Sequence, residues 1–529
     1  MKRKNKIRSS MIWNGAIILT ISGLITKVLS AVYRIPYHYL SGDIGFYIYQ
    51  QIYPFYGISV FLSTFGFPVV ISKLLTEQNS ERERREVVKV SFVFLLLFSG
   101  FLALFQYTTA DYIAEAMEDK GLTPLIQLVS LSYLFIPFMA VIRGYYQGEN
   151  NMFPTALSQV TEQFVRVGCI LLFVYLFIQT RQSIYDVGAA AILGSLIGSG
   201  AALIVLLSFV LRLRREKLGS VRLLGSFRII RKLVSQGFWV CLSGMSLLFM
   251  QLIDSFTLYG ELTSGGIDEI TAKVLKGVYD RGLPLIQLGT VVGTAFSLSL
   301  VPVISTAFLQ KDRRLLQYKA SLALRVGTVV GFGAAGGLCL IIKPTNAMLY
   351  GDYRGSDVLA ILSITVAFTT LAATSSAIIQ GMNRVYIPAL SVLIGIIVKW
   401  QLNEFLVPSF GTKGAAFASV MCFAFITFGN VTYLRVVRVL PRLSFSSLYT
   451  VLKALLVMAV VLIVYQLLWP VILRDEGNQH ALVALTSVVL GGLVYMSTIL
   501  KMGMFTLEEL AMLPLGSKLA KLGRKREER

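Results

Sequence analysis

Seven ionisable side chains lie inside long apolar stretches of this sequence, where an uncompensated charge costs several kcal/mol. Such groups neutralise one another or face a water-filled cavity, so each is a candidate for binding or coupling an ion. Cations outnumber acids, a balance that favours the binding of an anionic group. The cations are Lys27, Arg34, Arg166 and Lys399, and the acids are Glu162, Asp254 and Glu404.

Glu162 and Arg166 share one face of a predicted helix over residues 153–179, because they are four residues apart. At 1.5 Å per residue they lie about 12 and 18 Å beyond Pro154, near the middle of a membrane. One interpretation is a self-compensating pair that holds the helix against its neighbours. The other is a cavity cation whose charge is tuned by the adjacent acid.

Lys27 belongs to the first apolar stretch, residues 11–33, and Arg34 closes it. Arg34 could be an interface anchor that reaches water or a cavity cation. Lys27 lies two turns deeper, and Asp254 occupies a similar depth within residues 234–258. An isolated acid at this depth predicts a partner, either Lys27 in a latch between two halves of the protein or a coupling cation.

The chain contains an internal repeat, which relates several of these residues. Its matched pairs, spaced by 233 or 234 residues, are Pro68 and Pro302, Gln147-Gly148 and Gln380-Gly381, Pro154 and Pro388, Ser158 and Ser391, and Arg166 and Lys399. Two membrane half-bundles of one design, each with a cation at the same depth, are typical of a transporter whose site lies between the halves.

Composition places these residues in membrane helices. Of 529 residues, 55% are hydrophobic and 15% charged, and the mean hydropathy is +0.70. A soluble globular domain has about 25% charged residues. Apolar runs recur between residues 11 and 501, and each is long enough to cross a hydrocarbon core of about 30 Å. We predict an all-α integral membrane protein with 14 transmembrane helices.

Positive charge predicts the orientation of these helices. Lys and Arg concentrate in alternate loops, including residues 73–89, 212–232 and 311–319, whereas the intervening loops are poorer in cations and often acidic. By the positive-inside rule, both termini are expected in the cytoplasm of a bacterial cell. The net charge of +21 is thus mainly a topology signal. Its scatter over short loops argues against nucleic-acid binding.

The repeat predicts five parts of the chain. They are an N-terminal lobe of six spans at residues 1–211, a basic cytoplasmic linker at 212–233, a C-terminal lobe of six spans at 234–440, two added spans at 441–502, and a basic amphipathic tail at 503–529. The two lobes have the same orientation, because each contains an even number of spans.

No pattern in the sequence indicates catalysis or a metal site. The four cysteines fall within predicted spans and share no ligand spacing. The glycine-rich stretches 194–200 and 331–337 lack the preceding strand and the following Lys-Ser/Thr of a phosphate loop, so they predict close helix packing. We expect no enzyme activity, no cofactor and no bound metal.

The motif from Arg143-Gly144 through Gln147-Gly148 and Pro154 to Arg166 resembles a hallmark of bacterial polysaccharide exporters. These belong to the multidrug/oligosaccharidyl-lipid/polysaccharide superfamily. Gln380, Gly381 and Pro388 are its counterparts in the second half. Residues 25–36 are similar to the first span of the stage V sporulation protein B group, which is related to the lipid II flippases of peptidoglycan synthesis.

The resemblance implies a V-shaped, MATE-like bundle of two six-helix lobes with two added helices. It also implies that the protein moves an undecaprenyl-diphosphate-linked saccharide from the inner to the outer leaflet by alternating access. Membrane lipids surround such a protein, and H⁺, Na⁺ or the membrane potential would drive it. The family's cavity arginines in the first span correspond to Lys27 and Arg34, although a lysine offers a point charge rather than a bidentate contact.

Two other functions remain open at this stage. An ion-coupled multidrug exporter of the same superfamily would use Asp254, Glu162 and Glu404 to bind cationic compounds. A membrane scaffold of envelope synthesis would transport nothing. For each of these functions we expect a monomer.

Overall fold

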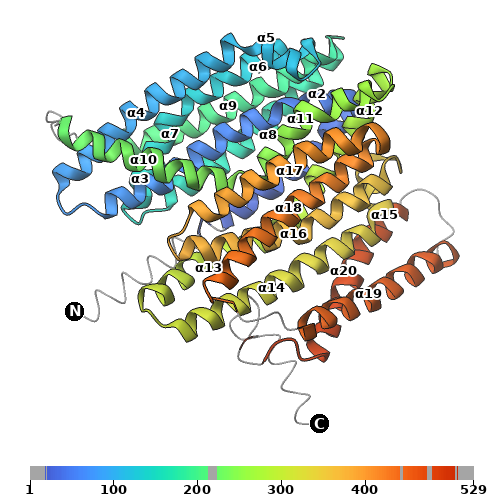
Figure 1. Cartoon of the computed structure of the whole chain (residues 1–529). Helices are drawn as coiled ribbons and strands as arrows, with labels where there is room; N and C mark the ends of the chain where they lie inside the picture. The colour runs from blue at the N-terminus through green and yellow to red at the C-terminus, as the bar shows by residue number, and fades with distance from the viewer. Residues whose placement is uncertain are drawn as a thin grey trace. The chain divides into compact units, whose positions relative to one another are not determined.

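The computed structural model describes residues 18–19, 21–211, 223–440, 445–472, 479–506 and 509, which are almost entirely helical and contain no strand. This confirms the all-α prediction (Figure 1). After a helix over residues 21–32, the helices are α2 (Arg34–Phe61), η1 (Leu62–Gly66), α3 (Phe67–Thr76), α4 (Glu81–Thr108), α5 (Ala110–Ala116), η2 (Lys120–Leu122), α6 (Thr123–Ser130), η3 (Leu131–Phe135), α7 (Ile136–Gly148), α8 (Phe153–Gln179), α9 (Ile184–Leu211), α10 (Leu223–Gly244), α11 (Ser246–Ser264), α12 (Glu269–Asp280), α13 (Gly282–Leu309), α14 (Arg313–Leu340), α15 (Ile342–Tyr350), α16 (Ser356–Gly381), α17 (Tyr386–Phe410), α18 (Thr412–Val436), α19 (Phe445–Ile472) and α20 (Gln479–Lys501).

The protein is a multi-pass membrane protein. Among the described residues, 11 helical segments are long and apolar enough to cross a membrane, or up to 12 when a bent helix pair counts as one span. The segment Ile21–Thr76 counts once, yet 56 helical residues extend about 84 Å, more than twice the thickness of a hydrocarbon core. The total of 14 spans stays a prediction.

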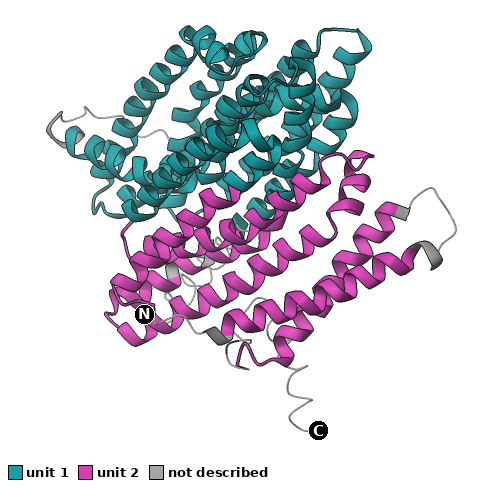
Figure 2. Cartoon of the chain, turned by 45° about the vertical axis from the view of Figure 1, so that its right-hand side comes forward, with its two compact units in different colours: residues 1–288, 385–418 teal, residues 289–384, 419–529 magenta. Residues whose placement is uncertain are grey.

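The chain groups into two compact units, which Figure 2 shows in separate colours. Unit 1 comprises Met1–Leu288 and Val385–Ala418, and unit 2 comprises Gly289–Arg384 and Ser419–Arg529. The predicted division into two six-helix lobes remains a prediction. Half of its linker, residues 212–222, lies outside the described residues, and so does most of the predicted C-terminal tail.

Pro68 explains a local defect between α2 and α3. The π-helical turn η1 precedes it, and the N–H of Phe67 bonds the carbonyl of Leu62 rather than that of Ser63. The next donor along the chain would be residue 68, but proline has no N–H. The Ser63 carbonyl therefore requires a donor from elsewhere in the protein, which is supplied by a side chain described below.

The predicted span over residues 234–258 is bent. Helices α10 and α11 meet at Met245 with a bend of 70°. Gly244 lies at the bend, where a Cβ atom would come 2.3 Å from Cζ of Phe61. The absence of a side chain thus permits α10 to contact α2, and a Ser-Gly pair is a common cause of such kinks.

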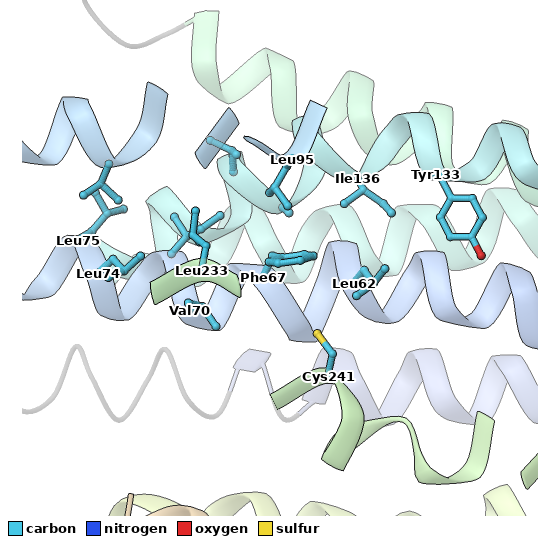
Figure 3. Close-up of a cluster of buried hydrophobic side chains, with 14 of the residues drawn as sticks. Leu62, Phe67, Val70, Leu74, Leu75, Leu95, Tyr133, Ile136, Leu233 and Cys241 are labelled. Carbon is cyan, nitrogen blue, oxygen red and sulfur yellow. The ribbon is translucent and has the colours of Figure 1, made fainter. Parts of the chain in front are cut away.

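An apolar cluster of unit 1 holds α3, α4, α7 and α10 together (Figure 3). Phe67 and Val70 of α3 share this cluster with Leu95 of α4, Ile136 of α7 and Leu233 of α10. Each is less than a tenth exposed. This packing supports the proline-containing segment from both sides.

Glycines of the motif permit close helix contacts in both halves of the sequence. A Cβ on Gly144 of α7 would lie 2.8 Å from Cβ of Ile71 in α3, and one on Gly381 of α16 would lie 2.8 Å from Cβ of Ile304 in α13. The motif glycines therefore act through packing, in which the small residue lets two helices approach closely.

The glycine-rich stretch 194–200 packs in the same way and yields a direct test. A Cβ on Gly198 of α9 would lie 2.7 Å from Cβ of Arg166 and 2.8 Å from the Glu162 carbonyl of α8, whereas one on Gly200 would meet nothing within 4 Å. We expect Gly198→Ala to lower stability by about 1–3 kcal/mol. The matched control Gly200→Ala should be neutral or stabilising, because alanine favours helix. Equal melting temperatures of the two purified variants would contradict this packing.

Candidate functional site

A fully buried arginine joins three helices of unit 1. Arg143 of α7 donates from Nε to Ser158 Oγ (3.1 Å) and from Nη2 to Glu162 Oε2 (2.9 Å), both on α8. Its Nη1 donates to Thr64 Oγ1 (2.6 Å) and to the Ser63 carbonyl (3.3 Å). Arg143 thus satisfies the carbonyl that Pro68 leaves without a donor. One guanidinium group neutralises an acid and closes a helix defect.

This arrangement corrects the first interpretation of Glu162. The carboxylate pairs with Arg143 and accepts from Ser199 Oγ of α9 (3.4 Å), rather than neutralising Arg166 on its own helix. The i,i+4 spacing allows contact but does not require it. Arg143 is held by other acceptors in the position that reaches Glu162, so the acid has a fixed partner from another helix.

Arg166 lies among aromatic rings rather than beside an acid. Its guanidinium carbon is 5.3 Å from the ring centroids of both Tyr33 and Tyr56. Its Nη2 donates to Ser30 Oγ (3.2 Å), and its buried Nε has no acceptor. Contact with ring faces stabilises a cation without cancelling its charge. Arg166 therefore keeps a positive charge that is available to an anion.

Arg34 is also a buried cation that lies against a tyrosine ring, and no described acid pairs with it. Its guanidinium carbon lies 4.3 Å from the ring centroid of Tyr53, and none of its three nitrogens finds an acceptor among the described residues. The hydroxyls of Tyr33 and Tyr49 are hydrogen-bonded to each other at 2.6 Å. A buried position rules out the interpretation of Arg34 as an interface anchor. Unsatisfied buried donors are costly and indicate capacity for an anionic ligand.

These two arginines and the four surrounding tyrosines form what we call the arginine–tyrosine cluster. Its members are Arg34, Arg166, Tyr33, Tyr49, Tyr53 and Tyr56. In the part of the chain that the structure describes, neither guanidinium forms an ion pair. The acid nearest to Arg166 in sequence, Glu162, is paired with Arg143 instead. The cluster combines two positive charges with several hydroxyl groups and no acid.

Lys399 and Asp254 form a second buried centre in unit 1. Lys399 Nζ of α17 lies 2.8 Å from Asp254 Oδ1 of α11, and both side chains are at most 2% exposed. Asn403 Nδ2 donates to the same carboxylate oxygen (3.1 Å), and the Tyr279 hydroxyl donates to the other (2.9 Å). Asp254 thus has a tethered ammonium ion as its counter-charge.

The predicted latch between Lys27 and Asp254 is wrong, because Lys399 holds Asp254. The Lys27 side chain is instead exposed on the helix over residues 21–32. Glu404 is also exposed, and its carboxylate accepts from the indole N–H of Trp400 on the same helix. Of the sequence-predicted acids, two have buried cationic partners and the third lies on the surface.

A short charged helix, α12, was missed by sequence reasoning. Asp268 caps this 12-residue helix by accepting from the N–H of Thr271 (2.9 Å). Lys276 bonds both oxygens of Asp280 at 2.7 Å, one turn along. Burial raises the pKa of the Asp280 carboxyl to about 6, although Lys276 acts to lower it. The i,i+4 spacing of this pair was the signal in the sequence.

Helix α12 contacts α2 where a glycine interrupts that helix. Gly42 has φ +68°, in the left-handed region that only glycine adopts readily. This break brings the Asp43 carbonyl to 2.2 Å from where a Cβ of Gly277 would be. The Asp43 carboxylate then pairs with Arg281 (2.6 Å) and with His38 (2.8 Å). A strained turn and a missing side chain thus position an ionic contact.

Lys273 of α12 extends this set of contacts to α9 and to the residue before η2. Its ammonium lies 3.2 Å from Asp119 and donates to the Tyr185 hydroxyl (2.8 Å). Three tyrosine rings, including Tyr47 and Tyr259, lie within 6.0 Å of it.

Across the described residues, no group of three or more His, Cys, Asp and Glu side chains could hold a metal ion.

The chain resembles known proteins over most of its length. Residues 12–308 match the family described as polysaccharide biosynthesis protein. It is 41% identical to the uncharacterized membrane protein YabM of Bacillus subtilis (strain 168), over 99% of this chain and 98% of that protein. It is 26% identical to the lipid II flippase MurJ and 25% identical to the stage V sporulation protein B of the same organism, over 92% and 78% of this chain and 95% and 81% of those proteins.

Solved structures confirm the fold. A lipid II flippase MurJ in an inward closed conformation aligns with a TM-score of 0.66 and 16% identity, over 92% of this chain and 97% of that one. An inward-facing multidrug resistance MATE transporter of the MOP superfamily aligns with a TM-score of 0.64 and 16% identity, over 80% and 98%. Sequence and fold agree with the predicted resemblance, and the chain belongs to the polysaccharide biosynthesis protein family of membrane proteins.

Proposed function

We propose that this protein is a flippase that moves an undecaprenyl-diphosphate-linked saccharide from the inner to the outer leaflet by alternating access. The observation that carries the proposal is the arginine–tyrosine cluster, where two buried guanidinium groups lack an acid partner. One guanidinium group can donate two parallel, short hydrogen bonds to the oxygens of a phosphate. Relatives that share most of the chain's length are named as a lipid II flippase and a sporulation protein.

We propose distinct roles for the four cations. Arg34 and Arg166 supply hydrogen-bond donors to the diphosphate, and the exposed Lys27 adds a point charge beside them on the preceding helix turns. Lys399 contributes indirectly, since it is paired with Asp254. The tyrosine hydroxyls offer further donors and acceptors, which suit both phosphate oxygens and sugar hydroxyls.

A multidrug exporter is the weaker alternative. Binding an organic cation requires a buried acid whose charge is not already cancelled. Glu162 is neutralised by Arg143 and Asp254 by Lys399. Glu404 is exposed and bonded to Trp400. The acids that kept this function open are therefore committed to internal contacts.

The test is a flipping assay in proteoliposomes with a fluorescent undecaprenyl-diphosphate saccharide, in which an impermeant quencher reports the accessible leaflet. We expect Arg166→Gln to slow flipping at least about tenfold, because each charge-assisted hydrogen bond to phosphate is worth about 1.5–3 kcal/mol. Arg166→Lys should recover only part of the rate, because lysine cannot make a bidentate contact.

Arg181→Gln provides the matched control, because Arg181 is exposed in the turn after α8. This variant should flip at the wild-type rate. The melting temperature and yield of each variant are measured in the same preparation, so that a folding defect is recognised. Unchanged flipping by Arg166→Gln would remove the cluster from the mechanism. Flipping that is absent from the wild-type protein as well would favour a scaffold.

A further inference from the structure

Unit 2 contains an open pocket of about 490 Å³ at the ends of three helices. Its polar lining comes from Lys343 of α15, Tyr353 after it, Gln466 and Trp469 of α19, and His480 of α20. Helices α15 and α19 both pack against α20 (Figure 1). The volume falls in the range of small-ligand pockets, which is about 300–1,000 Å³.

The pocket lies where two membrane spans reach the interface. Trp469 is the last residue of the apolar segment Ser447–Trp469, and His480 is the first of His480–Lys501. Tryptophan and tyrosine concentrate at this depth, because the ring contacts the acyl chains while the polar N–H or O–H group reaches water. A ligand in the pocket would therefore be in reach of lipid headgroups.

The lining is cationic and rich in donors. Lys343 is exposed and forms no ion pair with a described residue, and none of the residues lining the pocket is acidic. The Tyr353 hydroxyl lies 3.2 Å from each ring nitrogen of His480, and the two rings are 5.5 Å apart, edge to face. This pair forms one wall with a polar edge.

One donor in the pocket lacks a partner. The indole nitrogen of Trp469 is buried and has no acceptor within the described chain. Gln466, by contrast, donates to the Leu340 carbonyl (3.2 Å) and is thereby fixed in place. Buried polar groups in native proteins are nearly always hydrogen-bonded, so an unmet indole N–H that lines a cationic pocket indicates an external acceptor.

Apolar surface continues from the pocket along both spans. Leu468 next to Trp469 and Leu482 next to His480 are about half exposed, and Leu467 and Leu485 are more so. Free phosphate would gain nothing from this surface, whereas an amphiphile would bury its acyl chains there. We propose that the pocket binds the phosphodiester headgroup of an anionic phospholipid, with Lys343 and the Trp469 N–H contacting the phosphate.

The experiment is native mass spectrometry of the full-length purified protein with three probes. These are dioctanoyl phosphatidylglycerol, dioctanoyl phosphatidylcholine and inorganic phosphate. We expect phosphatidylglycerol to bind at least about fivefold more tightly than phosphatidylcholine, since only the former has a net negative charge to meet Lys343. Lys343→Gln should remove this preference. Trp469→Phe keeps an aromatic ring but removes the N–H, and it should weaken binding about threefold.

Lys501→Gln is the matched control, because Lys501 is exposed at the opposite end of α20. It should bind both lipids as the wild type does. Equal affinity for the two lipids, or an unchanged preference in a Lys343→Gln variant that melts normally, would refute the proposal. Displacement of the lipid by an equal concentration of inorganic phosphate would also refute it and identify a free-phosphate site. Because the pocket shares no residue with the arginine–tyrosine cluster, its failure leaves the proposed flippase activity untouched.

Discussion

Replacement of Arg143 by methionine is expected to destabilise the protein by about 3–5 kcal/mol. The substitution keeps an unbranched apolar stem but leaves the Glu162 carboxylate buried without its ionic partner. It also removes the donor to the Ser63 carbonyl, which Pro68 cannot replace. The measurement is the melting temperature of the purified variant in detergent, with unfolding monitored by intrinsic fluorescence.

A double variant distinguishes the buried charge from the lost hydrogen bonds. Arg143→Met with Glu162→Gln should recover a large part of the loss, because the uncompensated charge is gone. The control is Arg84→Met, which breaks the half-exposed ion pair between Arg84 and Glu149 and should cost less than about 1 kcal/mol. If the single and double variants melt at the same temperature, Glu162 does not depend on Arg143.

Replacement of Lys399 by methionine should have an effect of similar size at the second buried centre, about 3–5 kcal/mol. Asp254 would keep Asn403 and Tyr279 as hydrogen-bond donors but would lose its counter-charge. Addition of Asp254→Asn should restore most of the stability. Lys232→Met is the control, since the Lys232–Glu77 pair is about one third exposed and should matter little.

The same variant addresses ion coupling. While Lys399 neutralises Asp254, the carboxylate has no charge to offer a mobile cation, so wild-type stability should be the same in sodium chloride and choline chloride. In Lys399→Met the acid is released, and sodium should raise the melting temperature by binding the folded state. If sodium also stabilises the wild-type protein, the prediction is wrong. The Lys399 ammonium group would then not take the place of a coupling ion at Asp254.

Much of the fold could be predicted from the sequence, because hydropathy over 18 or more residues is a local property. The all-helical membrane class was correct, and so was the packing role of Gly194 and Gly198. Two local features were missed. The bend at Met245 depends on contact between Gly244 and Phe61, and α12 is too short and too charged to resemble a span.

The partners of the buried charges were harder to predict. Helical spacing offered Arg166 as one partner for Glu162, and a similar depth offered Lys27 or a coupling cation for Asp254. The structure pairs Glu162 with Arg143 and Asp254 with Lys399. An ion pair forms only when two atoms come within about 4 Å. In both pairs the partners lie on different helices, so helix spacing within one element does not identify them.

The sequence by itself determined that this is a membrane protein of repeated design, and that its buried charges need partners or a ligand. Both follow from composition and from the cost of a charge in a low-dielectric medium. Only the tertiary structure decided which charges are cancelled and which are left over. By placing Arg143 beside Glu162 and Lys399 beside Asp254, it leaves Arg34 and Arg166 among tyrosines with donors to spare. Helix packing sets these distances, and one-dimensional spacing does not.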